Sequence, residues 1–240
     1  MRIQERNLSV PVSAFDEIGA EYYDSSRHPT CANFRFATSL RLAEWLKGYR
    51  DGQLCEVGCG KSLAAEILFR QNSFLPRIIL TDDSAIMLEY SRPWEARGAQ
   101  LKVAGADALP VRSGSLQYLI SCLGDPYNSR TFWQEVARVL APDGRVFYTT
   151  PAHDWSQAFR QGKAANEAEF ELADGRHVAI PSYIQPEADQ IQLIEEAGLR
   201  IKEVSNVTVG DLAGQTLSRK LLSHRGLEAP VVTGFSAMKP

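Results

Sequence analysis

Short apolar runs alternate with longer amphipathic stretches through most of the chain. Five short runs have the composition of strands and stand at 54–57, 77–81, 100–104, 119–122 and 145–150. Between them, apolar residues recur every three or four positions, which is the spacing of one helix face. Strands that alternate with helices in this way predict an α/β fold built on a parallel sheet.

The helical pattern also indicates where the helices begin and end. We expect helices at 32–47, 63–69, 85–92 and 132–140, and another that starts at Pro186 and ends at Ala197-Gly198-Leu199. Near the N-terminus, Ser13 and Asp16 match a capping box, which predicts a short helix that ends before Asp24. Residues 27–30 then form a turn-like link to the next helix.

A turn and a hairpin are expected after the helix at 132–140. Pro142-Asp143-Gly144 predicts a turn that separates this helix from the fifth strand. Two strands, 169–172 and 177–181, flank Asp174-Gly175, which is a hairpin signal. We expect this hairpin to form a cap over the active-site edge of the sheet.

The C-terminal residues predict the last two strands of the sheet. We place the sixth strand at 200–209 and the seventh at 231–238, returning antiparallel at the sheet edge. Between these two strands, residues 210–227 predict a polar and partly helical excursion. No internal repeat or linker divides the chain.

Composition and charge narrow the class of protein. The chain has 240 residues, 44% of them hydrophobic, which fits one domain with a sizeable core. A net charge of −3 argues against binding nucleic acid through broad phosphate neutralisation. The sequence has no apolar run of about 18 residues, which a transmembrane helix needs, and residues 1–20 have no apolar signal core. We therefore expect a cytoplasmic protein.

The four cysteines do not form a metal-binding pattern. Cys55 and Cys59 lie close together, but no second pair or nearby histidine completes a zinc set with them. Cys31 and Cys122 stand apart. We expect four reduced thiols and no metal.

The most informative stretch is the glycine turn that follows the first strand, residues 54–62. A strand that passes through glycines into a helix presents backbone N–H groups to a ligand. A P-loop would need glycine where this chain has Cys55, and a dinucleotide fingerprint would need glycine at Leu63. The remaining pattern is Glu56-x-Gly58-x-Gly60.

A carboxylate, Asp82, closes the second strand, 24 residues after Gly58. An acidic side chain at this place can accept hydrogen bonds from both ribose hydroxyls of a nucleoside cofactor. This spacing suits either a nicotinamide cofactor or S-adenosylmethionine.

Four segments in order resemble the class I S-adenosylmethionine-dependent methyltransferases. The glycine turn resembles the family's first motif, and residues 82–88 resemble its "D-x-S-x-x-M-L" segment. Residues 105–110 are similar to "G-D-A-x-x-L-P", and residues 137–145 closely resemble "A-R-V-L-K-P-G-G-R". The resemblance covers about residues 15–150. Two departures are Ser62, where relatives often have glycine, and Gln117, where many have aspartate.

The resemblance implies a fold and a cofactor. The fold is a doubly wound, mostly parallel seven-stranded sheet, in which S-adenosyl-L-methionine lies across the ends of the first three strands and leaves as S-adenosyl-L-homocysteine. We divide this single domain, 1–240, into an N-terminal helical flap (1–50), a cofactor-binding core (51–150), a cap insertion (151–185) and the C-terminal part of the sheet (186–240).

Site residues follow from the same resemblance. Glu56 is expected to order the turn, and Gly58, Cys59 and Gly60 to contact the methionine part of the cofactor. Asp82, or its neighbour Asp83, is expected to bind the ribose. The adenine-binding residues are expected to be Ala106, Asp107 and Ala108. The segment 15–24 looks like the family's "A-x-x-Y-D" flap, whose Tyr23 would cover the cofactor, although an ordinary amphipathic helix also explains it.

The acceptor side of the site is less defined. Asp125-Pro126-Tyr127 resembles the "[D/N]-P-P-[Y/F]" motif of amino methyltransferases but has one proline fewer. A tight turn bordering the pocket is the other interpretation of this segment. The candidate catalytic residues are His28, Asp125, Tyr127 and His153, since a base is useful where the acceptor is protonated.

We therefore expect a methyltransferase for a small molecule, with an oxygen or nitrogen acceptor. One alternative is methylation of an amino group on a nucleobase or protein. The other is a regulatory or partner protein that binds S-adenosylmethionine without turnover. We expect neither nucleic acid nor membrane as a partner, and leave the oligomeric state open, with a homodimer as one option.

Overall fold

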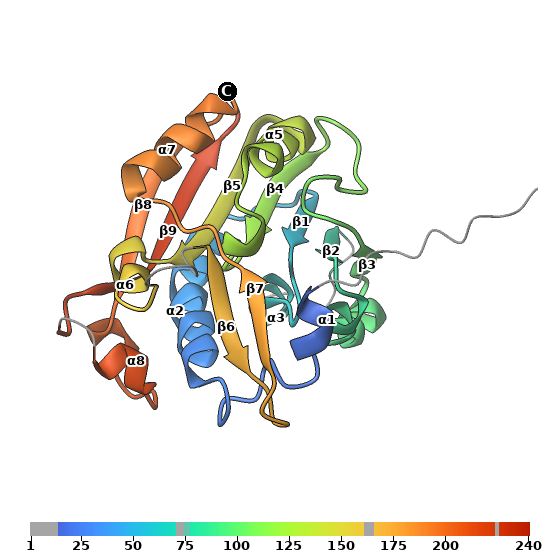
Figure 1. Cartoon of the computed structure of the whole chain (residues 1–240). Coiled ribbons are helices and arrows are strands. Elements are labelled where there is room, and N and C mark those ends of the chain that lie inside the picture. Colours follow the sequence, from blue (N-terminus) through green and yellow to red (C-terminus); the bar gives the residue numbers. More distant parts are fainter. Residues whose placement is uncertain (1–13, 71–74, 76, 161–165, 224–225) are drawn as a thin grey trace, which may run out of the picture.

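The computed structural model describes residues 14–70, 75, 77–160, 166–223 and 226–240. Seven strands form one sheet in the order β3-β2-β1-β4-β5-β9-β8 (Figure 1). Their bounds are β1 (Leu54–Val57), β2 (Ile78–Asp82), β3 (Gln100–Val103), β4 (Leu116–Ser121), β5 (Leu140–Pro151), β8 (Arg200–Thr208) and β9 (Pro230–Met238). The first five strands are parallel, and β9 is antiparallel to both of its neighbours. The expected doubly wound seven-stranded fold is confirmed.

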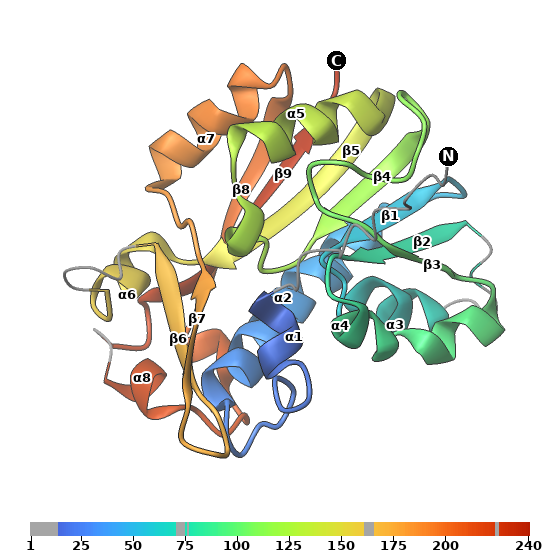
Figure 2. The same ribbon diagram turned by 45° about the vertical axis from the view of Figure 1, so that its right-hand side comes forward.

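Helices cover both faces of the sheet (Figure 2). The helices are α1 (Ala14–Ile18), α2 (Pro29–Leu46), α3 (Leu63–Phe69), α4 (Ala85–Glu89), α5 (Arg130–Val139), α6 (His153–Gln157), α7 (Glu187–Glu196) and α8 (Arg219–Leu222). On one face Phe132 and Val136 of α5 pack with Ile194 of α7. On the other face Leu42 of α2 packs with Leu68 of α3. Because β1 and β2 are buried along their whole length, they occupy the centre of this sandwich.

The N-terminal elements begin differently from our expectation. Residues 27–30 were expected to be a link, but α2 starts at Pro29, two residues before Cys31. Proline suits this position because the first N–H of a helix has no partner within the helix. The predicted capping residue Ser13 lies outside the described residues, and α1 ends already at Ile18. The helix expected at 85–92 likewise ends at Glu89 and is followed by a 3-10 helix, Arg92–Arg97.

Strands β4 and β5 are longer than the apolar runs suggested. β4 begins at Leu116, because Leu116 and Tyr118 face inward on either side of the exposed Gln117. β5 begins at Leu140, and the predicted turn at 142–144 is an irregularity inside this strand instead. Asp143 has a φ of 60° there, and a Cβ on Gly144 would lie 2.9 Å from the Leu116 carbonyl oxygen.

The seventh strand does not lie at the sheet edge. β9 is inserted between β5 and β8, so the sixth strand of the sheet, β8, is the edge strand. Burial gives the reason, since Val231 to Phe235 are all buried, whereas most of β8 is partly or fully exposed. The denser apolar strand takes the inner place.

The predicted hairpin is confirmed and forms a separate cap. β6 (Glu167–Glu171) pairs antiparallel with β7 (His177–Pro181) around Gly175, whose φ is +82°. Its inner side packs on α1 through Ile18, Leu172, Val178 and Ile180. The excursion between β8 and β9 is partly helical, as expected, with a 3-10 turn at Gly210–Leu212 and α8. Among the described residues, no helix is both long and apolar enough to cross a membrane.

Candidate functional site

The glycine turn joins the end of β1 to α3 and is tied to the end of β2. Gly58 and Gly60 have φ values of +61° and +42°, which side chains disfavour. The Cys59 N–H donates to the Thr81 carbonyl at 2.9 Å, and the Gly60 N–H donates to Asp82 Oδ2 at 2.8 Å. The turn is therefore held on the carboxylate that closes the second strand.

Glu56 organises this turn from below. Its buried carboxylate accepts hydrogen bonds from Ser62 Oγ, from the Leu63 N–H at 3.2 Å and from the Ala64 N–H at 3.3 Å. Burial raises the pKa of Glu56 to about 6, although these hydrogen bonds act to lower it. Ser62 also caps α3 by accepting from the Ala65 N–H at 2.9 Å. Serine therefore has a structural role at this departure from the family pattern.

Asp82 lies where the cofactor ribose is expected. Its second oxygen accepts from the Ser84 N–H at 3.0 Å, and the residue is 5% exposed. Burial raises the pKa of Asp82 to about 7. Asp82 and the exposed Asp83 both line the large cavity at this edge of the sheet, so the geometry keeps both as candidates.

Two tyrosine rings pack directly on the glycines. The Tyr23 hydroxyl accepts from the Lys61 N–H at 2.7 Å, beside Gly60. The Tyr127 hydroxyl donates to the Val57 carbonyl at 2.8 Å, and it would lie 2.6 Å from a Cβ on Gly58. Glycine is required at both places because a side chain would collide with these rings.

The expected adenine-binding residues follow β3. Ala106 is half-buried, and Asp107 and Ala108 are exposed. These three residues are not part of the lining of the cavity. Their role in binding adenine stays a prediction.

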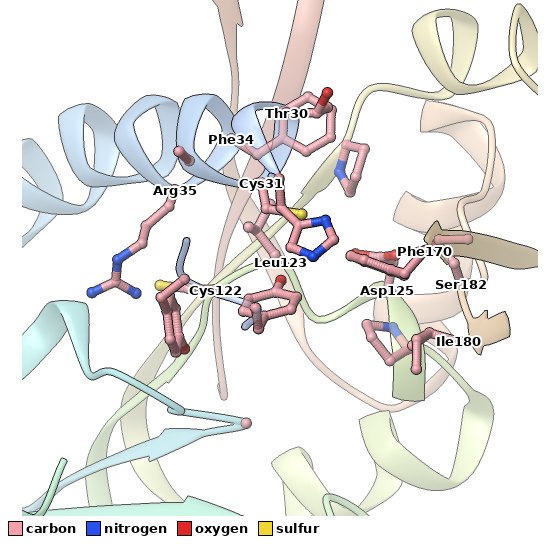
Figure 3. A pocket seen from close by; sticks show the side chains of 18 of the residues that line it. Thr30, Cys31, Phe34, Arg35, Cys122, Leu123, Asp125, Phe170, Ile180 and Ser182 are labelled. Atoms are coloured by element: carbon pink, nitrogen blue, oxygen red, sulfur yellow. Dashed lines mark hydrogen bonds between the residues drawn. The ribbon is translucent and has the colours of Figure 1, made fainter. Parts of the chain in front are cut away.

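One cavity of about 1430 Å³ starts at the glycine turn and extends under the cap. Small-molecule sites commonly measure about 300–1000 Å³, so this cavity has room for two ligands. Figure 3 shows Arg35 and Cys122 on one side of it, and Phe170, Ile180 and Ser182 on the other. We call the part away from the glycine turn the distal arm, lined by Cys31, Phe34, Trp155, Phe159, Phe170 and Lys220.

The distal arm has an aromatic wall. Phe34 and Trp155 meet edge to face with ring centroids 4.7 Å apart, and Phe159 lies 4.8 Å from Trp155. Opposite them, the rings of His28 and Phe170 are 5.5 Å apart. Planar apolar ligands pack well against such a wall.

The two histidines proposed as catalytic residues differ in their surroundings. The side chain of His28 is 8% exposed and lines the cavity, and its Nε2 has no hydrogen-bond partner. Burial lowers the pKa of His28, so the ring is neutral at pH 7. His153 is outside the cavity lining, 28% exposed, with Nδ1 3.1 Å from Asp154. The geometry favours His28.

The Asp125-Pro126-Tyr127 segment forms a 3-10 helix at the cavity wall. Asp125 accepts a hydrogen bond from Ser182 Oγ, and burial raises its pKa to about 6. Its carbonyl accepts from the Tyr183 N–H at 2.8 Å, which ties this segment to the end of the hairpin. The Tyr127 ring packs on Gly58 and on Phe132. Both side chains therefore have structural contacts, in agreement with a turn that borders the pocket.

Arg35 is a site residue that the sequence interpretation missed. It projects from α2 into the cavity, and its guanidinium lies 5.3 Å from the centre of the Tyr23 ring (Figure 3). Its Nη2 is buried without a hydrogen-bond partner, and the nearby Glu66 carboxylate is 3.7 Å away. The signal was available, since His28, Cys31 and Arg35 share one helix face by their spacing.

The described part of the chain offers no obvious metal centre. No group of three or more histidine, cysteine, aspartate or glutamate residues is arranged there to hold a metal ion. All four cysteines are free thiols. Burial raises the pKa of Cys31 and of Cys55 to about 12, which keeps these thiols protonated.

Comparison with known proteins identifies the core of this fold. Residues 55–148 match the family model of a methyltransferase domain. No curated protein matches the chain in sequence. Solved structures with 15–16% identity do match over most of the chain, and similarity at this level indicates a shared fold.

Three of these structures illustrate the similarity. A chain in the complex of the Haloferax volcanii Trm112 methyltransferase activator has a TM-score of 0.66 at 16% identity, over 95% of this chain and 96% of that one. Geranyl diphosphate C-methyltransferase from Streptomyces coelicolor, solved with S-adenosyl-L-homocysteine, gives 0.61 at 16%, over 83% and 78%. An S-adenosylmethionine-dependent methyltransferase from Mesorhizobium loti gives 0.59 at 15%, over 86% and 100%.

Proposed function

We propose that this chain uses S-adenosyl-L-methionine to methylate a small molecule bound in the distal arm, because residues 55–148 match the family model of a methyltransferase domain. The observation that supports this most directly is the continuity of the cavity, which is lined by Gly58 and Asp82 at one end and by the aromatic wall at the other. A cofactor and an acceptor that occupy one continuous cavity can meet in line.

The side chains at the glycine turn fit the cofactor. Asp82 and Asp83 line the cavity, where a carboxylate can accept hydrogen bonds from ribose hydroxyls, and Gly58 of the turn lines it as well. Arg35 adds a buried guanidinium nitrogen that has no hydrogen-bond partner and lies 3.7 Å from the Glu66 carboxylate, and such a group suits the carboxylate of the methionine part. Tyr23, which packs on Gly60, would cover the methionine end of the cofactor.

The chain has little covalent chemistry to perform. S-adenosyl-L-methionine supplies a methyl group that is already activated by its sulfonium. The protein orients the acceptor along the line of displacement, and its cap excludes water. We propose an oxygen or nitrogen acceptor, and His28 as the polar residue that contacts the acceptor molecule.

The alternative of an amino methyltransferase has less support. It would require the Tyr127 ring to stack on the target nitrogen, but the Tyr127 hydroxyl is bonded to Val57 and Ser121. The alternative of a binding protein without turnover has no specific observation in its favour, and release of S-adenosyl-L-homocysteine during turnover would exclude it.

Calorimetric titration of the full chain with S-adenosyl-L-methionine, S-adenosyl-L-homocysteine and NAD tests the cofactor. We expect the first two to bind and NAD not to bind. Asp82→Ala and Gly58→Val should abolish binding while circular dichroism shows the fold intact. Binding of NAD alone, or normal affinity in both variants, would contradict the assignment.

The variant Arg35→Met tests whether Arg35, which the sequence interpretation missed, contacts the cofactor. We expect the affinity for S-adenosyl-L-homocysteine to fall by about 10- to 100-fold, the usual value of a hydrogen bond to a charged group. Arg77→Met is the control, because Arg77 is exposed, pairs at the surface with Asp51 and is outside the cavity lining. Equal affinities of the two variants would remove Arg35 from the site.

A further inference from the structure

The N-terminus of α2 opens into the distal arm. Thr30 and Cys31 of its first turn line the cavity, and Figure 3 shows both at the end of the helix. The helix has 18 residues, so its N-terminus carries the full partial positive charge of a helix dipole.

The backbone donors of this turn can be accounted for one by one. The His28 N–H donates to the Asp24 carbonyl at 2.8 Å, Pro29 has no N–H, and the Ala32 N–H donates to the His28 carbonyl. No side chain caps the helix. The N–H groups of Thr30 and Cys31 are therefore the two that a ligand in the cavity can satisfy.

His28 gives a second and independent indication of a ligand. It is the N-cap residue, it lines the cavity, and its buried Nε2 has no hydrogen-bond partner. The Glu21 carboxylate is 3.8 Å away and is already bonded by Arg27 Nε at 2.6 Å and by the Ala173 N–H at 3.1 Å. A buried polar atom without a hydrogen-bond partner is unfavourable, and a bound ligand that accepts its hydrogen bond would remove this penalty.

Three basic side chains near the arm can attract an anion. Arg160, Arg219 and Lys220 line it, and Lys220 Nζ lies 5.9 Å from the centre of the Phe159 ring. The buried carboxyl group in this region, Asp125, is hydrogen-bonded by Ser182, which Arg160 also contacts. The three glutamates of β6 also line the cavity, but they are exposed, so that water and salt screen their charges.

We propose that the N-terminal turn of α2 is an oxyanion subsite, in which the N–H groups of Thr30 and Cys31 and the Nε2–H of His28 bind a carboxylate or phosphate group of the methyl acceptor. The aromatic wall formed by Phe34 and Trp155 holds the apolar body of the same molecule. The acceptor is thus an aromatic compound with an acidic substituent. Only the identification of the bound molecule as the methyl acceptor rests on the proposed function. The subsite itself is expected to bind an anion without the cofactor.

Four probes with the same ring test the charge. The full chain, with and without saturating S-adenosyl-L-homocysteine, is titrated with phenylacetate, phenyl phosphate, phenylacetamide and phenethylamine. We expect one or both anions to bind at least tenfold more tightly than the neutral amide and the amine. The better of the two anions identifies the carboxylate or the phosphate as the natural group. Equal affinity for all four probes would overturn the proposal.

Two pairs of variants test the location. His28→Phe keeps a ring but removes Nε2, and it should weaken anion binding at least tenfold, whereas His153→Phe, outside the cavity lining, should not. Thr30→Asp places a competing carboxylate at the helix start, and Thr30→Asn has the same size without the charge. We expect loss of anion binding in the first and retention in the second. Unchanged binding in His28→Phe and Thr30→Asp would overturn the subsite.

Cofactor affinity measured on the same variants separates the two proposals. Normal binding of S-adenosyl-L-homocysteine together with loss of the anion supports the subsite and leaves the cofactor end intact. Absence of cofactor binding in the unmodified chain would contradict the proposed function, while the anion titration still decides on the subsite.

Discussion

At the scale of single residues, two glycines with almost the same φ allow two costs of adding a side chain to be distinguished. One cost is backbone strain, and the other is steric collision with neighbouring atoms. Gly58 and Gly114 have φ values of +61° and +64°, but a Cβ on Gly58 would collide with Tyr127, and one on Gly114 would meet no atom within 4 Å. We expect Gly114→Ala to cost about 1–2 kcal/mol, the penalty of a left-handed conformation, and Gly58→Ala clearly more. Urea unfolding of both variants measures the difference in the free energy of unfolding. Equal losses of stability would show that the Tyr127 ring moves aside at no cost.

Asp82 should make cofactor binding depend on pH near neutrality. Its pKa is raised to about 7 by burial, and the ribose hydroxyls need the charged carboxylate as acceptor. The affinity for S-adenosyl-L-homocysteine should therefore be constant above pH 8 and fall about tenfold by pH 6. Calorimetry across this range measures the slope. Asp82→Asn should bind weakly at every pH, and a flat profile in the unmodified chain would exclude a titrating Asp82.

The sequence predicted the residues of the glycine turn but not their neighbours. Glu56, Gly60 and Asp82 belong to local motifs whose spacing is visible in the chain. Arg35 and the preference for His28 over His153 depend on how α2 packs over the sheet, and a local pattern does not encode that packing. Whether the cofactor contacts these residues stays a prediction.

At the scale of elements, the hairpin and α1 form a cap with its own small core. Ile180 is buried among Ile18, Leu172 and Val178, away from both faces of the sheet. We expect Ile180→Ala to loosen the cap locally, by about 2–4 kcal/mol as for other large-to-small core changes. Hydrogen exchange should speed up in β6 and β7 and remain unchanged in β1 and β4.

The matched variant for the cap is Ile120→Ala in β4, where the same side chain is buried in the sheet core. It should lower the stability of the whole sheet rather than of the hairpin alone. If Ile180→Ala also accelerated exchange throughout β1 and β4, the cap would be part of the main cooperative unit.

Most elements were predicted from periodicity, and the errors have one cause. Propensity located α3 and β7 correctly because their patterns are local. The order of β9 and β8, the bulge at 142–144 and the start of α2 at Pro29 depend on which partner each segment finds. Burial of the apolar β9 decided the first of these, and no window of sequence shows it.

At the scale of the whole molecule, three buried carboxyl groups determine how stability responds to pH. Burial raises the pKa of Glu56 and Asp125 to about 6 and that of Asp82 to about 7, above about 4 in an unfolded chain. Between about pH 4 and pH 7 the folded state therefore binds more protons than the unfolded state. The free energy of unfolding thus rises as the pH falls from 8 toward 5.

Other titrating groups limit this gain at lower pH. The pKa of Glu135 is lowered, chiefly by its hydrogen bond with Arg138, so its contribution is lost only below about pH 4.5. His28, whose pKa is lowered by burial, opposes the trend below about 6.5, because the unfolded state then takes up a proton that the folded state resists. We expect maximal stability of the unliganded chain on the acid side of neutrality, between about pH 5 and 6.

Thermal unfolding of the unliganded chain between pH 5 and 8 tests this balance. The midpoint at pH 6 should exceed that at pH 8 by at least about 2–4 °C, the shift that 1 kcal/mol gives in a chain of this size. Asp125→Asn removes one buried charge and should reduce the slope, whereas Asp174→Asn at the exposed hairpin turn should not. A midpoint that rises toward pH 8 would show that the three groups are better solvated than their burial implies. Bound S-adenosyl-L-homocysteine should stabilise the chain more at pH 8 than at pH 6, because it uses the charge on Asp82 that the unliganded fold tolerates poorly.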